Sequence, residues 1–487
     1  MGVTAFFPAI AEIFLAGVSI VLVLVAAFGG EDGKASGLMR KLAVASLIIT
    51  GILVASYGNT PSLAFGHLFM TSPFMVYMKL LVLFGATIIL LMSRGHVAAD
   101  NINRPEFPLL ILLSVLGMMV LISSNDLMVL YMGIELQSLP LYVIAAMRRD
   151  SVRSSEAGLK YFLLGALSSG LLLYGASLIY GFTGSTNYGE IASSLSQDVL
   201  NGGVSSGAVI GIVFLISGMA FKISAAPFHM WTPDVYEGSP TIVTAFFAVV
   251  PKLAAMSLFL RVTYGMLGSA SDSWQQVVVA IAMASMIIGA LGAIMQTDLK
   301  RLMAYSSIAH MGYALVGMAS AQAEGISAVM IYMAIYIVSS IGIFALILTL
   351  SREGTAVTKI NDLAGYSRTH PLYAACMLIF LFSMAGIPPL GGFFGKWFVF
   401  SAAVNAGLVP LAVFGVLSSV IGAFYYIRII KVMYVDDVAD ALDQPDRRTN
   451  GMIILSMAVI TALMVFVLSS LREGIMGTLP YIAFIAG

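Results

Sequence analysis

The feature that most constrains this chain is a series of apolar runs, each about 20 residues long, separated by short gaps. A run of this length crosses the hydrocarbon core of a bilayer as an α-helix, because each residue advances the helix by about 1.5 Å. Only 10% of the residues are charged and the mean hydropathy is +0.98, whereas a soluble domain carries about 25% charged residues. The sequence therefore predicts an all-α, polytopic membrane protein.

The apolar runs predict about fourteen transmembrane helices and no β-strands. The first run is too long for the apolar part of a signal peptide and no basic stretch precedes it, so we expect a retained helix. The longest polar stretches, near 183–206, 351–371 and 431–449, are expected to be loops. The expected helices lie near residues 5–28, 38–57, 73–93, 107–123, 126–147, 159–182, 207–228, 239–262, 275–296, 301–319, 325–350, 372–403, 407–430 and 450–470.

Lysine and arginine are distributed unevenly between the two sides that this helix count defines. Of the 24 Lys and Arg residues, eighteen fall in loops on one side and only Arg261 and Arg472 fall on the other; four lie inside helices. A helix missed in mid-chain would move every later loop to the wrong side and remove this asymmetry. The positive side of a membrane protein is cytoplasmic, so we expect both termini in the periplasm.

The composition excludes several functional classes. The formal net charge is zero, so no basic excess indicates a nucleic-acid partner. Cys376 is the only cysteine, which excludes an internal disulfide and a cysteine-ligated zinc or iron–sulfur site. We therefore expect no cofactor or metal in this chain.

Five ionisable residues remain deep inside the expected helices. A charge at the middle of a bilayer costs about 2.5–3.5 kcal/mol on insertion scales, so it requires a reason to be there. The five residues are our candidate site for proton translocation: Glu135, Lys222, Lys252, His310 and Lys396.

Proton transfer is the chemistry that best explains lysines in this setting. Burial weakens the hold of an amine on its proton, and a nearby carboxylate restores it. A lysine whose carboxylate partner moves or changes charge therefore has a switchable proton affinity. Several such lysines in a row, bridged by water and histidine, can pass protons along the membrane plane.

Structural roles remain open for individual members and for two further residues. Glu135 could be a static counter-ion that anchors Lys222, and a lone histidine such as His310 is more often a hydrogen-bonded core residue. Lys79 lies seven residues into its helix, close enough to the interface to snorkel, and Glu12 near an interface is expected to be structural. A structural role is hardest to assign to the three deep lysines.

Two of the expected helices are interrupted at corresponding places. Pro227 follows Lys222, and the segment 386–392, which contains Pro388 and Pro389, precedes Lys396. Paired interrupted helices indicate an inverted-repeat transporter core. The helices divide into 1–106, a five-helix block at 107–262, a second at 275–430, and a C-terminal part at 431–487. A block of five helices crosses the membrane an odd number of times, so the second block begins on the opposite side of the membrane from the first and is inverted relative to it.

Two long stretches resemble the antiporter-like subunits of respiratory complex I. One runs from Lys222 to Lys252 and contains PFHMWTPDVYEGSPT; the other is DLKRLMAYSSIAHMGYALVG at 298–317. The resemblance extends over essentially the whole chain. The PDVYEGSPT form is typical of the N-type branch. Lysine at 396 argues against the M-type branch, and the lack of a long lateral helix after 470 argues against the L-type branch.

The resemblance implies roles for the same five residues. Glu135 matches the family's glutamate on the fifth helix, and Lys222 matches the lysine on the broken seventh helix. Lys252 and His310 match the connecting residues, and Lys396 matches the terminal lysine on the broken twelfth helix. The family function is to couple quinone reduction to proton pumping.

The resemblance also implies partners and a location. NADH, FMN, iron–sulfur clusters and quinone would belong to partner subunits. The expected partners are other membrane-arm subunits, including a second antiporter-like subunit and small K-like and J-like subunits, with the lipid bilayer of a bacterial inner membrane around them. The alternative is a subunit of an Mrp-type cation/proton antiporter, in which an ion gradient and not a redox reaction drives transport.

Overall fold

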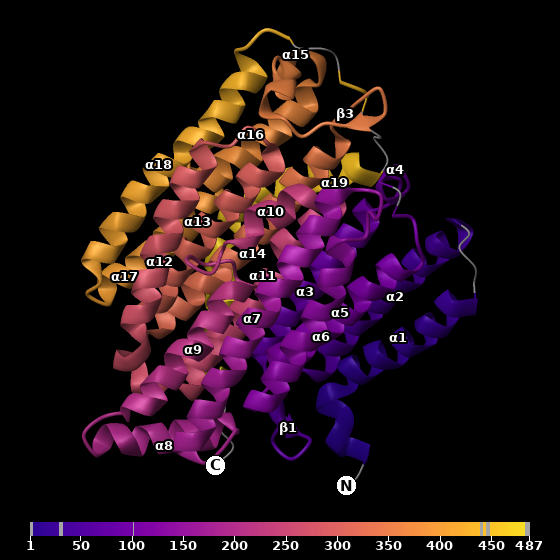
Figure 1. Cartoon of the computed structure of the whole chain (residues 1–487). Helices are drawn as coiled ribbons and strands as arrows, with labels where there is room; N and C mark the ends of the chain where they lie inside the picture. The colour runs from indigo at the N-terminus through magenta and orange to yellow at the C-terminus, as the bar shows by residue number, and fades with distance from the viewer. Residues whose placement is uncertain (1–2, 29–32, 101, 439–441, 445–448, 483–487) are drawn as a thin grey trace.

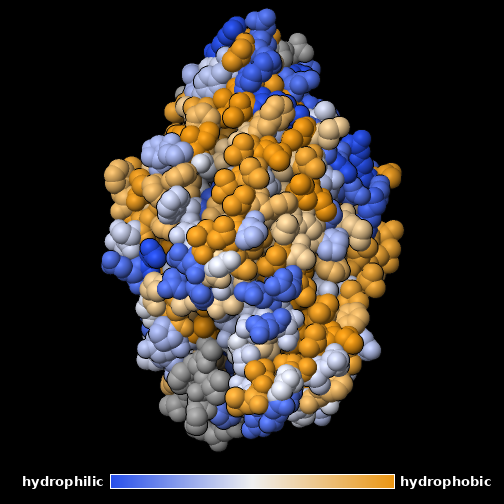
Figure 2. Space-filling model, turned by 90° about the vertical axis from the view of Figure 1, so that its left-hand side faces the viewer, coloured by the Kyte–Doolittle hydropathy of each residue, from blue (hydrophilic) through white to orange (hydrophobic). Residues whose placement is uncertain are grey.

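The protein is a bundle of long helices, as the sequence predicts. The computed structural model describes residues 3–28, 33–100, 102–438, 442–444 and 449–482. Within these residues, eleven helices are long and apolar enough to cross a membrane, and two shorter apolar helices, Ser206–Lys222 and Pro371–Ala385, accompany them. Hydrophobic side chains cover the broad middle of the face seen in Figure 2, and hydrophilic side chains gather at its upper end.

Each of the fourteen expected segments corresponds to a helix or to two half-helices in the described part of the chain, which confirms the predicted fold class. The helices before the first block are α1 (Ile10–Phe28), α2 (Gly33–Tyr57), α3 (Pro73–Met92) and the short α4 (His96–Ala99). The next group is α5 (Glu106–Ser123), α6 (Leu127–Ala145), α7 (Val152–Thr183), α9 (Ser206–Lys222) with α10 (Trp231–Gly238), and α11 (Thr241–Leu260). The following group is α12 (Ser271–Ile294), α13 (Leu299–Ala319), α14 (Ala323–Thr349), α16 (Pro371–Ala385) with α17 (Gly391–Asn405), and α18 (Val409–Tyr434). The chain then forms α19 (Thr449–Leu463) and α20 (Leu468–Met476).

The loops contain more structure than the sequence predicts. The stretch near 183–206 includes a further helix, α8 (Tyr188–Leu200), at the lower end of the bundle in Figure 1. The expectation of no strands is wrong for two short antiparallel hairpins, β1 (Ser62–Ala64) with β2 (Phe69–Thr71) and β3 (Ser351–Arg352) with β4 (Thr355–Ala356). Strands of two or three residues are too short to produce a readable alternation of apolar and polar positions.

The predicted helix breaks are present, and the backbone explains the second one. The chain leaves α16 through Gly386, whose φ of +87° is a left-handed conformation that glycine adopts without steric cost. Gly392 then lies so close to Ser383 that a Cβ atom would come within 1.7 Å of the Ser383 carbonyl oxygen. Both glycines are therefore required for the two half-helices to meet at this angle and distance.

A matched pair of contacts relates the two groups of helices. Asp126 caps α6 and accepts a hydrogen bond from Thr186 at 2.6 Å; Asp298 caps α13 and accepts one from Thr358 at 2.5 Å. In both cases 60 residues separate the aspartate from the threonine. The first contact lies near α8 and the second near the β3–β4 hairpin, at opposite ends of the bundle (Figure 1). An inverted repeat would have such a relation; the division into 107–262 and 275–430 stays a prediction.

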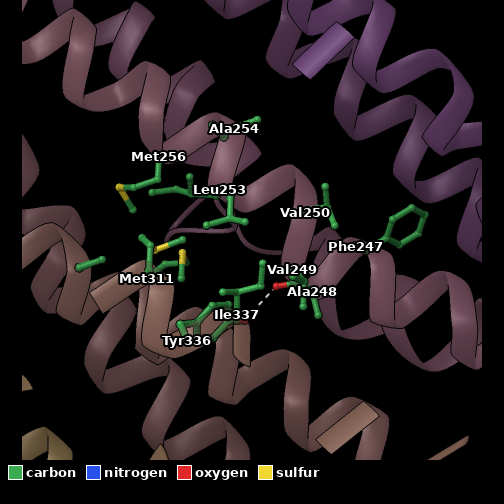
Figure 3. Packing of buried hydrophobic residues seen from close by; sticks show 14 of the residues in the cluster. Phe247, Ala248, Val249, Val250, Leu253, Ala254, Met256, Met311, Tyr336 and Ile337 are labelled. Carbon is green, nitrogen blue, oxygen red and sulfur yellow. Dashed lines mark hydrogen bonds between the residues drawn. The ribbon is translucent and has the colours of Figure 1, made fainter. Parts of the chain in front are cut away.

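Two helices form the centre of the bundle. The apolar parts of α11 and α14 are completely buried among the other helices. Figure 3 shows the packing around α11, where Val249, Val250 and Leu253 meet Met311 of α13 and Ile337 of α14. The Tyr336 hydroxyl reaches across this layer and donates a hydrogen bond to the Ala248 carbonyl at 3.0 Å. The core therefore places the middle of α11, which carries Lys252, far from lipid.

We predict that the two aspartate caps contribute comparably to stability. Replacement of Asp126 or Asp298 by alanine removes a helix cap and leaves a threonine hydroxyl without its acceptor, and each change should lower the free energy of unfolding by about 2 kcal/mol. The measurement is the midpoint of thermal unfolding of the purified protein in detergent. Asp272→Ala removes an exposed aspartate that caps no helix and is the control. Midpoints indistinguishable from that control would contradict the prediction.

Candidate functional site

Lys222 is the last residue of α9, so its side chain projects from the point where the helix breaks. The side chain is buried, and its Nζ donates a hydrogen bond to the Ser138 hydroxyl of α6 at 2.8 Å. Ser138 in turn donates to the Ile134 carbonyl. The amine is therefore held by a neutral hydroxyl in the middle of the bundle.

Glu135, the possible counter-ion of Lys222, does not form a direct ion pair with it. Its carboxylate is near enough to interact with the amine through charge, but Lys222 bonds to Ser138, one helical turn farther along α6. Glu135 is half-buried, and no described residue offers its Oε1 atom a hydrogen bond. A carboxylate close to an amine but not bonded to it can change that distance by a small side-chain movement.

Lys252 lies at the centre of α11 and is 1% exposed. Its Nζ donates a hydrogen bond to the Ser307 hydroxyl of α13 and lies 5.4 Å from the centre of the Tyr236 ring. Ser307 also shares a hydrogen bond of 2.7 Å with the Tyr336 hydroxyl of α14. Among the described residues no carboxylate oxygen lies within 4 Å of this amine, so neutral oxygens and a π face are its immediate surroundings.

His310 lies one turn after Ser307 on α13 and is bonded on both ring nitrogens. Its Nδ1 is 2.5 Å from the Tyr332 hydroxyl and its Nε2 is 3.0 Å from the Tyr426 hydroxyl. Tyr332 belongs to α14 and Tyr426 to α18, so the histidine joins three helices. A cavity of about 10 Å³ lies between His310 and the helix break at Ser383 and Gly392, which is close to the space of one water molecule.

Lys396 uses the second helix break directly. Its Nζ donates to the Ala385 carbonyl at 2.9 Å and to the Ser419 hydroxyl of α18 at 2.8 Å. Ala385 is the last residue of α16, so its carbonyl is one of those that a helix end leaves without an intrahelical partner. The amine also lies 4.8 Å from the centre of the Tyr313 ring.

The structure connects four of the five predicted residues in one layer: Lys222, Lys252, His310 and Lys396. The contacts between successive members differ in kind. Lys252 reaches His310 through Ser307 and Tyr336, and His310 reaches Lys396 past the ring of Tyr313, which it meets edge-on at 5.7 Å. Between Lys222 and Lys252 the connection is aromatic, through the rings of Phe221, Trp231 and Tyr236. Glu135 stands at the outer edge, next to Lys222.

The expectation that Lys79 snorkels is wrong. Its side chain is buried, and its Nζ forms an ion pair of 2.5 Å with Glu12 of α1, which is buried as well. The amine also lies 5.1 Å from the centre of the Phe69 ring. Lys79 therefore has a partner that fixes its charge, unlike Lys252 and Lys396, and its contacts tie α1 to α3.

Sequence reasoning missed the hydroxyl groups that hold the site together. Tyrosine is a common packing residue in membrane helices, and the sequence alone did not single out the tyrosines bonded to His310 and Ser307. The only available signal was the spacing of Tyr332 and Tyr336, which places two hydroxyls on one face of a buried helix. The missed hydroxyl partners are Ser138, Ser307, Tyr332, Tyr336, Ser419 and Tyr426.

No group of three or more His, Cys, Asp or Glu side chains that could hold a metal ion occurs in the part of the chain that the structure describes. The single cysteine, Cys376, is buried and unpaired. The polar chemistry of the site is therefore that of amines, hydroxyls, one imidazole and one carboxylate.

Known proteins resemble this chain over nearly its full length. The family model described as "NADH:quinone oxidoreductase/Mrp antiporter, TM" matches residues 124–422. NADH-quinone oxidoreductase subunit N of Rhodospirillum rubrum is 53% identical over 96% of this chain and 95% of its own length. The protein of the same name from Parvibaculum lavamentivorans is 52% identical over 91% of this chain and 90% of its own length.

Solved structures share the fold. A chain of respiratory complex I from Thermus thermophilus superposes with a TM-score of 0.80 at 30% identity and covers 95% of this chain and 99% of that one. A chain of the Mrp complex from Dietzia sp. superposes with a TM-score of 0.83, covers 99% of this chain and 98% of that one, and is 20% identical, a level that shows the fold alone.

Proposed function

Because this chain belongs to the family of NADH-quinone oxidoreductase subunit N, we infer that it is a proton-translocating, antiporter-like membrane subunit of that complex. Other subunits of the complex are then its partners. The Mrp alternative rests on a likeness of fold at 20% identity, whereas relatives of about half-identical sequence carry the subunit N name. We assign the chemistry of NADH, FMN, iron–sulfur clusters and quinone to partner subunits.

We propose that protons move along the row Glu135, Lys222, Lys252, His310 and Lys396. The observation that carries this proposal is Lys252, a fully buried amine whose charge-stabilising neighbours among the described residues are a serine hydroxyl and a tyrosine ring. A hydroxyl accepts a proton on one side and releases one on the other, so Ser307, which is bonded to both Lys252 and Tyr336, is suited to relay. The small cavity that Tyr336 and His310 both line has the space for a water molecule to carry the proton on to the histidine. The two tyrosine hydroxyls on His310 support either tautomer of the ring.

Glu135 is proposed as the element that switches the first lysine. The charge state of a buried amine depends on how close a carboxylate lies, and Glu135 lies near Lys222 without being bonded to it. A change in this separation would change whether Lys222 or the next member of the row holds the proton. The helix break beside Lys222 provides the local freedom for that movement.

The orientation and the neighbours of the subunit are also proposals. The end of the bundle that carries α4, α15 (Tyr366–Thr369) and the β3–β4 hairpin holds the lysine- and arginine-rich loops (Figure 1), so we place it in the cytoplasm and both termini in the periplasm of a bacterial inner membrane. We propose a second antiporter-like subunit and small K-like and J-like subunits as direct neighbours. The blocks 107–262 and 275–430 would be the two halves of the translocation unit.

We predict that Lys222→Ala abolishes proton pumping without loss of assembly. The variant removes the amine that bonds to Ser138, so the first step of the row has no proton carrier. The measurements are NADH–quinone activity and proton uptake in membrane vesicles, both normalised to assembled complex. Lys41→Ala, on the exposed surface of α2, is the matched control. Unchanged pumping by the Lys222 variant would refute the proposed row.

A paired substitution at Lys396 separates proton release from a fixed charge. Arginine retains the charge but releases no proton at any physiological pH, whereas alanine removes both. If Lys396 carries protons, Lys396→Arg should impair pumping nearly as much as Lys396→Ala, at least about tenfold each. Pumping by assembled complex is the measurement. An arginine variant near wild type beside an inactive alanine variant would reject proton release at this position.

Two cysteine variants test the orientation. Arg149→Cys lies in the exposed loop between α6 and α7, and Asn201→Cys lies just after α8 at the opposite end of the bundle. A membrane-impermeant thiol reagent should label position 201 in intact spheroplasts and position 149 only in inverted vesicles. Buried Cys376 should contribute little background. The reverse labelling pattern would show that the topology is upside down.

A further inference from the structure

A polar cavity of about 740 Å³ opens at the end of the bundle that we assign to the periplasm. Its mouth lies between the β1–β2 turn and α8, where Gly66, His67 and Gln197 are exposed. Its inner wall is buried and is made by Asn125, Tyr188 and Arg261. The row of proton-carrying residues does not include this cavity, and we name it the vestibule.

Arg261 is a buried cation at the inner wall of the vestibule. The sequence placed it in a loop, but its side chain is only 2% exposed. Its guanidinium donates to the carbonyls of Ile122 and Ser124 and to the Asn125 side chain, and it lies 5.4 Å from the centre of the Tyr188 ring. Within the described residues no carboxylate oxygen lies within 4 Å of it. Glu190 also lines the vestibule, but its carboxylate accepts a hydrogen bond from Ser185 and forms no ion pair with Arg261. The positive charge of Arg261 is therefore not neutralised by a direct partner among the described residues.

Arg261 and Lys252 lie on one continuous helix. Nine residues separate them, which corresponds to about 13–14 Å along the axis. Ser257 lies between them, one turn before Arg261, and no described residue offers its buried hydroxyl a hydrogen bond. A buried hydroxyl of this kind is a position at which ordered water is usually found. At Arg261 the helix changes to a π-helical turn, Arg261–Met266, a feature that occurs often at functional sites.

The second group of helices provides a natural comparison. Arg428 of α18 donates to the carbonyls of Ile294 at 2.7 Å and Gln296 at 2.5 Å, at the end of α12, as Arg261 does at the end of α5. Both arginines therefore fasten the corner between two consecutive helices. Arg428 is only half-buried and does not line the vestibule. Both arginines thus make the corner contact, but of the two only Arg261 lines the vestibule.

We propose that the vestibule brings periplasmic water to within a few helical turns of Lys252, and that Arg261 is a fixed-charge barrier that stops protons from returning along this path. The proposal rests on the assignment of Lys252 to the proton row. A guanidinium stays charged at every physiological pH, and an unneutralised arginine in a narrow polar path excludes protons and other cations. In this arrangement α11 carries the proton carrier, and the π-helical turn that continues it carries the charge that protects this carrier from the positive side of the membrane.

The first test removes the charge and measures passive proton flux. The complete complex, purified and reconstituted in liposomes without NADH, receives an imposed potassium–valinomycin potential, and an internal pH dye reports proton entry. Arg261→Gln should raise the flux by on the order of tenfold. The charge that this substitution removes repels a proton that passes a few ångströms away, and it therefore slows proton entry. Arg428→Gln removes the equivalent corner contact and should stay at the wild-type flux. Equal fluxes in the two variants would overturn the proposal.

The second test leaves Arg261 and its corner contacts in place. Ser257→Asp puts a carboxylate one helical turn before the arginine, where the two can pair and the positive charge is neutralised. This variant should leak, whereas Ser257→Asn, of the same size and without charge, should not. The pair decides the question even if Arg261→Gln fails to assemble. A tight Ser257→Asp variant would overturn the barrier.

The third test locates the inner end of the path. Adding Lys252→Met to the leaking Arg261→Gln variant should return the flux to the wild-type level. A leak that persists would overturn Lys252 as the end point. The flux measurements test the barrier and need no turnover of the complex. The pumping assays of the Lys222 and Lys396 variants test the proposed proton row. A wrong barrier is therefore distinguishable from a wrong proton row.

Discussion

The constraint on which the rest of the structure depends is the burial of two amines, Lys252 and Lys396, for which the described residues provide no carboxylate partner. Lys252 and Lys396 are held by serine hydroxyls, one backbone carbonyl and tyrosine rings. These neighbours solvate a charge without fixing it, because removal of the proton leaves no unpaired carboxylate behind. The contrast is Lys79, whose ion pair with Glu12 would leave a buried anion alone if the amine became neutral. The same residue type is therefore static in α3 and suited to transfer in α11 and α17.

The helix breaks follow from this constraint. A continuous helix satisfies its own carbonyls and offers a buried amine no strong acceptor. The end of α16 at Ala385 frees the carbonyl that Lys396 uses, and Gly386 and Gly392 allow the next half-helix to return close enough for that contact. In the other group the lysine itself ends the helix, so Lys222 projects from the break toward Ser138 of α6. The break after α16 thus supplies a hydrogen-bond acceptor for Lys396, and the break after α9 leaves the side chain of Lys222 free to project toward α6.

The sequence predicted the features that depend on one segment at a time. The helical spans follow from run length, and the five ionisable residues are conspicuous because a deep charge is costly. The partners of those residues could not be predicted, because Ser138 and Lys222, or Lys252 and Ser307, meet only when distant segments pack, and serine and tyrosine occur in many membrane helices without a role. Arg261 was misplaced for a related reason: run length cannot show whether a residue at a helix end faces solvent or a buried corner. The short hairpins and α8 lie in polar stretches where periodicity is too brief to read.

The two groups of helices share a scaffold but not its chemistry. Measured from the capping aspartates, Glu135 and Ser138 of α6 occupy the positions that Ser307 and His310 occupy in α13, nine and twelve residues after the cap. The first group therefore places a carboxylate one turn before the serine that holds its own Lys222, whereas the second places a serine against Lys252 of the first group and a histidine between Lys252 and Lys396. A carboxylate stabilises a protonated amine and a neutral relay does not. If protons move along the row that we propose, this unequal substitution on a shared scaffold gives the row two different ends, as transfer of charge in one direction requires.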